Sequence, residues 1–228
     1  MAKNIFLFCL LIILTKITFS QNVGKFGSNL GMKTVLGKEL RPPYTDVTSY
    51  YSFVEPGTKP DEEKDGKKYY YVYVWIPVAA PEIGVRMISP IPSKMKPEAN
   101  DFKSATYEKS LTDASSYFDT WITLERAVNI VSKNDIDTKI ANAKWVQLDY
   151  NDDSQELHAQ PSGNKYNSVM RVTSQVSDPL KAITVGLYRI GFTSFKAGEV
   201  QGGFVAQIGA PVKLPGIIVA GTLAGLSR

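Results

Sequence analysis

Eight short runs rich in Tyr, Val, Ile, Thr and Phe, separated by Pro, Gly, Asn and Asp, constrain the fold of this chain more than any other feature. Branched and aromatic side chains pack well on a pleated sheet, whereas the separating residues favour turns. We therefore predict β-strands at residues 46–54, 69–77, 84–89, 117–125, 145–150, 166–174, 183–195 and 199–209. Eight strands with little helical pattern predict a mainly β protein, an antiparallel jelly-roll β sandwich with a few short peripheral helices.

The run YYYVYVWIP carries large side chains on both faces of its predicted strand. One face holds Tyr69, Tyr71, Tyr73 and Trp75, and the other holds Tyr70, Val72, Val74 and Ile76. Large residues on both faces favour a strand that is buried on two sides. The alternative is that the tyrosine face is exposed and binds a ligand.

The links between the strands differ in pattern. Residues 56–68 and 89–101 lack apolar periodicity, so we expect exposed connectors. Residues 125–144 have helical spacing of apolar side chains and predict two short helices that are broken around Asn134.

The first twenty residues have the layout of a secretory signal peptide, with Lys3 before an apolar run and small residues before a cleavage site after Ser20. The only cysteine, Cys9, lies in that run. The mature chain would therefore contain no disulfide, no catalytic thiolate and no cysteine zinc site.

The expected organisation is a signal peptide at residues 1–20, a glycine-rich N-terminal segment at 21–45 whose start, residues 21–31, is loose, a jelly-roll domain at 46–212 and an apolar tail at 213–228. The tail is too short to span a membrane, so a last strand that packs on the sandwich is favoured over a membrane contact.

The charge and the motifs exclude several function classes. Removal of the signal peptide with Lys3 and Lys16 lowers the formal net charge from +4 to +2, which does not indicate nucleic-acid binding. The sequence contains no G-x-S-x-G, no H-E-x-x-H and no phosphate-binding glycine loop. The single histidine, His158, cannot form a multi-histidine metal site. We therefore expect a protein that is not an enzyme.

The stretch LDYNDDSQELH, residues 148–158, places three aspartates close together, and like charges repel unless water or a cation screens them. Asp149, Asn151 and Asp153 match the first three ligand positions of an EF-hand loop. The match then fails, because Ser154 replaces the required glycine and Gln160 replaces the bidentate glutamate. Two interpretations of this stretch therefore remain: a solvated surface loop, or a calcium site that takes further ligands from elsewhere in the fold.

Four stretches together resemble one family in order and spacing: YYYVYVWIPVAAPEIGVRMISP, YFDTWITLER, NKYNSVMRV and GLYRIGFTSFKAGEVQGGFVAQIG. Over roughly Asp46 to Pro215 the chain is similar to the leptospiral major outer-membrane surface lipoprotein family. The resemblance implies a jelly-roll sandwich outside the cell that binds calcium and adheres to matrix proteins.

The resemblance also implies the ligands of one calcium ion. The FDTW motif gives Asp119 and Thr120, the acidic loop gives Asp152 and Asp153, and NKYNS gives the carbonyl of Tyr166. The family's loop is an almost unbroken aspartate run, whereas Tyr150, Asn151 and Ser154 interrupt it here. Fewer carboxylates predict weak binding, with a dissociation constant of about 10⁻⁴ to 10⁻³ M.

Two departures limit what the resemblance implies. The family carries a lipid on a cysteine at its mature start, and this chain has no such cysteine, so we expect release or peripheral association with the outer membrane. The family's helical C-terminal extension, implicated in matrix binding, has no counterpart after LAGLSR.

The sequence therefore predicts an exported, calcium-binding interaction or adhesion module with an extracellular protein or polysaccharide ligand. One alternative is a secreted carbohydrate-binding or sugar-active sandwich that uses the tyrosine face or a carboxylate pair. Another is a structural component of the envelope.

Overall fold

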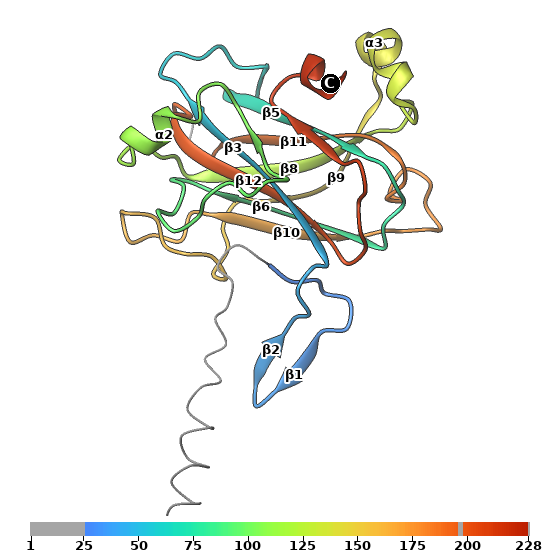
Figure 1. Cartoon of the computed structure of the whole chain (residues 1–228), viewed down its shortest axis with the longest axis horizontal. Coiled ribbons are helices and arrows are strands. Elements are labelled where there is room, and N and C mark those ends of the chain that lie inside the picture. Colours follow the sequence, from blue (N-terminus) through green and yellow to red (C-terminus); the bar gives the residue numbers. More distant parts are fainter. Residues whose placement is uncertain (1–25, 196–197, 228) are drawn as a thin grey trace, which may run out of the picture.

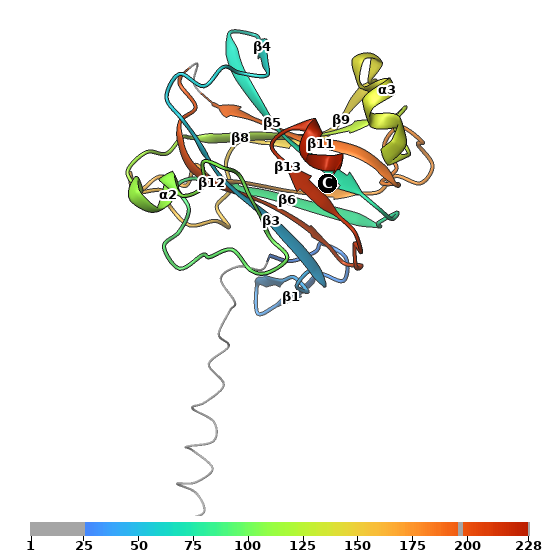
Figure 2. The same ribbon diagram turned by 45° about the horizontal axis from the view of Figure 1, so that its top comes forward.

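The computed structural model describes residues 26–195 and 198–227 and contains two large β-sheets packed face to face (Figures 1 and 2). Sheet I has the strand order β10-β6-β12-β3-β7, and sheet II has the order β13-β5-β11-β8-β9 with β4 paired to β5. Among the strands of the described residues, only the pairing of β3 with β7 is parallel. The predicted mainly β, antiparallel sandwich is confirmed, and the jelly-roll connectivity stays a prediction.

The strands of sheet I are β3 (Asp46–Val54), β6 (Glu82–Ile88), β7 (Phe102–Lys103), β10 (Ser168–Thr173) and β12 (Gly202–Ala210). Those of sheet II are β4 (Glu62–Lys64), β5 (Lys67–Ile76), β8 (Thr120–Ala127), β9 (Trp145–Asn151), β11 (Gly186–Ser194) and β13 (Ile218–Ala220). A separate hairpin consists of β1 (Lys33–Val35) and β2 (Lys38–Leu40). The helical turns are α2 (Lys109–Thr112), η1 (Lys133–Asp135), α3 (Ile136–Lys139), η2 (Ile140–Asn142) and η3 (Leu223–Ser227).

All eight predicted strands are present, with ends that differ by up to three residues. The prediction of two helices in residues 125–144 is wrong in its first half. Ala127 belongs to β8 and lies opposite Trp145 of β9, so strand pairing rather than a helical face accounts for its burial. Ile130 is buried in the following turn, and one short helix, α3, follows between two 3₁₀ turns.

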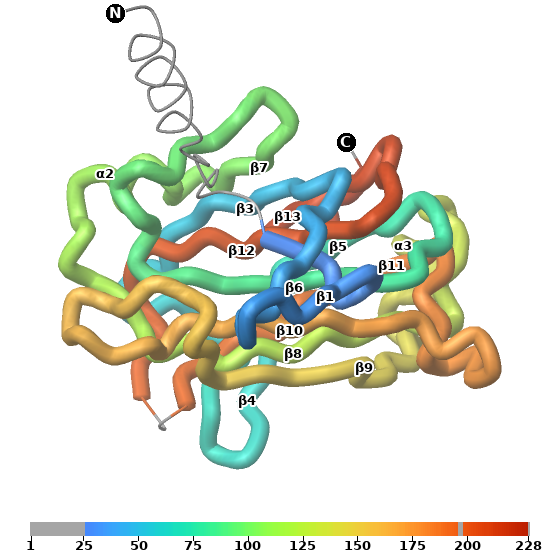
Figure 3. The backbone as a smooth tube through the Cα atoms, turned by 90° about the horizontal axis from the view of Figure 1, so that it is seen from below, coloured from blue at the N-terminus to red at the C-terminus, as the bar shows by residue number. Residues whose placement is uncertain are grey.

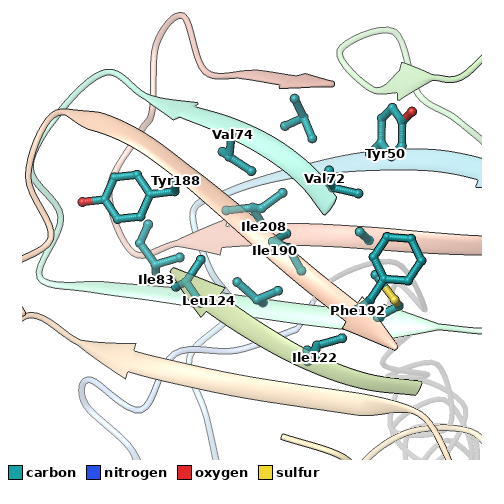
Figure 4. Packing of buried hydrophobic residues seen from close by; sticks show 14 of the residues in the cluster. Tyr50, Val72, Val74, Ile83, Ile122, Leu124, Tyr188, Ile190, Phe192 and Ile208 are labelled. Atoms are coloured by element: carbon teal, nitrogen blue, oxygen red, sulfur yellow. The ribbon is translucent and has the colours of Figure 1, made fainter. Parts of the chain in front are cut away.

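The core lies between the two sheets and takes one face of each strand (Figure 4). From β5, Val72, Val74 and Ile76 enter this core. Trp75, on the opposite face of β5, is buried in a second cluster with Leu187 and Leu226. Most of the YYYVYVW strand is therefore buried on both faces, as the first interpretation of this run predicted.

The segment before β3 is structured from residue 26 onward, which corrects the expectation of a loose segment. Phe26 and Tyr44 are buried with their rings 5.0 Å apart in an edge-to-face arrangement, and both pack on sheet I. Gly84 makes this approach possible, because a Cβ atom there would lie 2.4 Å from the Tyr44 hydroxyl oxygen. The hairpin β1-β2 projects from this anchor away from the sandwich (Figure 1).

The C-terminal tail adds β13 to the edge of sheet II, where Ile218 lies opposite Trp75 of β5. No helix within residues 26–195 and 198–227 is long and apolar enough to cross a membrane. The predicted signal peptide, with Cys9, lies outside the described residues.

Candidate metal centre

The five predicted calcium ligands lie where three chain segments meet at one end of the sandwich. Thr120 begins β8, Asp152 and Asp153 follow β9, and Tyr166 precedes β10. β8 and β9 are neighbours in sheet II, and β10 is the edge strand of sheet I beside them (Figure 3). The site therefore connects the two sheets.

Thr120 and Tyr166 are in direct contact. The backbone N–H of Thr120 donates to the carbonyl oxygen of Tyr166 at 3.0 Å, and the Thr120 hydroxyl donates to the same oxygen at 3.1 Å. Two oxygens that each bind calcium at about 2.4 Å lie about 3 Å apart when they are neighbours around the ion. The hydrogen bond between this hydroxyl and this carbonyl therefore holds two oxygens at a separation that also suits adjacent calcium ligands.

Ser168, which sequence reasoning did not select, joins the predicted residues together. Its hydroxyl oxygen lies 2.8 Å from Oγ1 of Thr120, 2.6 Å from the Thr120 carbonyl oxygen and 2.6 Å from the Asp152 carbonyl oxygen. Thr120 and Ser168 are both fully buried. This hydroxyl thus holds the ends of β8 and β9 against the start of β10.

Two amide side chains complete the network, and neither was predicted to lie here. Gln160 is buried, and its side-chain nitrogen donates to the carbonyl oxygens of Phe118 at 2.6 Å and Ser89 at 2.8 Å. Asn151 accepts a hydrogen bond from the backbone N–H of Val169 at 3.0 Å. Asn151, which matched an EF-hand ligand position, and Gln160, which replaced the required glutamate, therefore both hold the acidic loop in place by hydrogen bonds.

The three carboxylates are less closely assembled. Asp119 and Asp152 are half-buried, and Asp153 is exposed. The side chain of Asp152 accepts the backbone N–H of Asp153 at 2.9 Å. Desolvation, followed by the charge of Asp152, raises the pKa of the Asp153 carboxyl. Within the part of the chain that the structure describes, no three or more His, Cys, Asp or Glu side chains form a group able to hold a metal ion.

The structure therefore joins Thr120, the Tyr166 carbonyl and the backbone of Asp152, but it does not bring Asp119, Asp152 and Asp153 into one carboxylate cluster. The donors are hard oxygens of the types that calcium prefers. The arrangement fits an ion that takes neutral oxygens from the buried network and carboxylates from the adjoining loop.

The outer face of sheet II holds the aromatic residues that suggested a carbohydrate site. The guanidinium group of Arg189 lies over the ring of Tyr71 at 3.8 Å and over the ring of Trp145 at 4.3 Å. It also pairs with Glu125 at 2.6 Å. Arg189 covers one face of each ring, and Tyr71 and Trp75 of the predicted tyrosine face are buried, which counts against the carbohydrate-binding alternative.

Comparison with known protein families gives a match over most of the chain. The model of the family Lipl32, described as surface lipoprotein of Spirochaetales order, matches residues 38–219. A comparison with curated proteins found no match. The matched range covers both sheets, including every segment of the candidate metal centre.

Proposed function

Because the chain belongs to the Lipl32 family of surface lipoproteins of the order Spirochaetales, we propose that it is a cell-surface interaction protein whose sandwich binds one calcium ion. The family is one of surface lipoproteins and not of enzymes. The proposed ligands are Asp119, Thr120, Asp152, Asp153 and the carbonyl of Tyr166.

The contact between Thr120 and Tyr166 is the observation that carries this proposal. It holds two neutral oxygens 3.1 Å apart, a separation that suits adjacent calcium ligands, beside a loop with two consecutive aspartates. Without a cation, the two adjacent carboxylates repel each other, and this repulsion adds to desolvation, the larger cause, in raising the pKa of Asp153. A bound divalent ion would remove that repulsion and fasten the loop to both sheets.

Such an ion would act as a structural or regulatory element rather than a catalytic one. It would connect the end of β9 to the starts of β8 and β10, and so fix the loop that the sandwich presents at this end. The proposed partner is an extracellular protein or polysaccharide that contacts this ordered loop. A role as a structural component of the envelope is the alternative proposal.

Calorimetric titration of calcium into the purified protein tests the proposal. We expect saturable one-site binding with a dissociation constant of about 10⁻⁴ to 10⁻³ M. The double variant Asp152→Asn with Asp153→Asn should lose it. The matched control is Asp137→Asn, which removes an exposed aspartate on α3, before the start of β9, whereas the acidic loop follows its end. Equal binding by the double variant and the control would refute the assignment.

A further inference from the structure

The N-terminal hairpin, residues 33–40, stands apart from the sandwich (Figures 1 and 2). All six residues of its two strands are exposed. An isolated two-stranded hairpin is marginally stable in water, and this one carries no packed face within the described residues. Its exposed side chains therefore contribute little to the stability of the fold and are available to contact a partner.

The strand register sorts these side chains onto two different faces. Residues directly opposite each other in an antiparallel pair share a face. Lys33 lies opposite Leu40 and Val35 opposite Lys38, so one face carries two lysines and two aliphatic residues. The other face carries Thr34 and Glu39, and Glu39 is neutralised by Arg41 at 2.9 Å.

The lysines on the first face have no intramolecular partner, since Lys33 and Lys38 take part in no hydrogen bond or ion pair within residues 26–195 and 198–227. The aliphatic residues beside them are widely open to solvent, with Val35 exposed at 47% and Leu40 at 56%. The face is therefore both cationic and apolar.

The turn at the tip places a leucine where its side chain contributes nothing to the fold. Leu36 and Gly37 both adopt positive φ angles, 51° and 74°. Two-residue turns of this kind favour Asn or Asp before Gly, because a larger side chain is strained in the left-handed region. Leu36 is nonetheless a leucine and is 98% exposed. A strained and fully exposed apolar residue indicates a role outside the chain.

The base of the hairpin is held firmly, which gives the tip a fixed direction. The backbone N–H of Ser28 donates to the Pro42 carbonyl oxygen at 2.8 Å, and that of Tyr44 donates to the Phe26 carbonyl oxygen at 3.1 Å. The buried Glu82 accepts the Tyr44 hydroxyl at 2.7 Å. These bonds fasten both ends of the projecting segment to sheet I.

We propose that the N-terminal hairpin inserts Leu36 into the headgroup region of a lipid bilayer that contains anionic lipids. An apolar tip flanked by lysines is the arrangement that binds such an interface, because aliphatic groups enter the acyl boundary while lysines meet the phosphates. The acidic Glu39 lies on the opposite face and is already paired, so it does not oppose this contact.

The charges favour a membrane over a second copy of the chain. A two-fold symmetric pair through the same face would gather four lysines, Lys33 and Lys38 of each copy, into one contact without an acidic partner on that face. Like charges opposite each other in a sheet contact are destabilising. An anionic surface has the complementary charge.

Sedimentation of the purified protein with phosphatidylcholine vesicles, with and without phosphatidylglycerol, tests the proposal. The key variant is Leu36→Asn, which removes the apolar tip but places the preferred residue in the turn, so the fold should be retained or slightly more stable. We expect it to lose about tenfold or more in affinity for both vesicle types, as burial of a leucine implies. The control Val131→Asn, which changes an exposed valine near α3, should bind like the unchanged protein.

The double variant Lys33→Gln with Lys38→Gln separates the charge from the apolar contribution. Each lysine near an anionic surface adds about fivefold in affinity, so the pair should cost about 25-fold on vesicles with phosphatidylglycerol and little on neutral ones. Unchanged vesicle binding by Leu36→Asn would overturn the proposal, as would absence of binding by the unchanged protein. A dimer in sedimentation equilibrium that Leu36→Asn abolishes, without vesicle binding, would assign the hairpin to a second copy instead.

Discussion

Replacement of Thr120 by valine separates the structural from the calcium-binding role of this residue. Valine has the same shape as threonine but replaces the hydroxyl by a methyl group. The variant loses the contacts of Oγ1 with the Tyr166 carbonyl at 3.1 Å and with the Ser168 hydroxyl at 2.8 Å. The Tyr166 carbonyl keeps its bond from the Thr120 backbone N–H, and Ser168 keeps the Asp152 carbonyl.

Because no buried partner is left without a hydrogen bond, the free energy of unfolding without calcium should fall by only about 1 to 2 kcal/mol. For a chain of this length, that change lowers the melting temperature by about 2 to 8 °C. Thr120→Val should also reduce the stabilisation of the native state by calcium. At about 10 mM calcium, a site with a dissociation constant of about 10⁻⁴ to 10⁻³ M stabilises the native state by about 1.4 to 2.7 kcal/mol.

Urea unfolding of both proteins, with and without about 10 mM calcium, measures the two contributions. The unchanged protein should gain stability from calcium, and Thr120→Val should lose most of that gain. The matched control is Thr123→Val, the same change at a buried threonine of β8 that is not a proposed ligand, so it should keep the calcium effect. Full stabilisation of Thr120→Val by calcium would refute Thr120 as a ligand. A loss above about 4 kcal/mol without calcium would refute the estimate for the hydroxyl.

Three further changes test other parts of the structure. Gly84→Ala should lower the free energy of unfolding in urea by about 2 to 4 kcal/mol, because the added Cβ would lie 2.4 Å from the Tyr44 hydroxyl oxygen. A decrease below about 0.5 kcal/mol would contradict the close packing at this position. The raised pKa of the Asp153 carboxyl means that the native state binds this proton more tightly than the unfolded state does. The group therefore stabilises the calcium-free protein at low pH and loses that contribution as pH rises through its folded pKa. Asp153→Asn should remove this part of the pH dependence of urea unfolding, and an unchanged pH profile would contradict the assignment. Arg189→Lys keeps the charge but loses the stacking between two aromatic rings and should cost about 1 kcal/mol, whereas an unchanged urea midpoint would show that the stacking contributes nothing.

The strands were predictable from the sequence because each is a local pattern of branched and aromatic residues between turn residues. The wrong helix has the same local origin, since Ala127 and Ile130 are spaced as on a helix face. Burial of Ala127 instead comes from its position opposite Trp145, which no local pattern records. The expectation of a loose N-terminal segment failed for a related reason, because Phe26 is buried by residues distant in the chain, such as Tyr44 and Arg86.

In the candidate metal centre, too, some residues were predicted from the sequence and others were missed. Resemblance to the family selected Thr120 and Tyr166, and the structure places them in contact. Ser168 and Gln160 were missed because a serine in a strand and a glutamine in a loop have no distinctive pattern in one sequence. Their roles arise from distant partners, such as Ser89 for Gln160 across 71 positions in the chain. The carboxylates of the acidic loop were noticed from local crowding, which does not specify how a cation would be coordinated.

The position of β12 bears on how this protein reaches its folded state. β12 lies between β6 and β3 in sheet I, so two of its neighbours are made long before it along the chain. Until Gly202–Ala210 arrives, β3 and β6 have no partner strand between them, and sheet I cannot close. Pairings this distant in sequence form slowly, because the loop must close before the contact is gained. A growing chain of this design therefore cannot complete sheet I until residue 210 has been made, however early β3 and β6 are available.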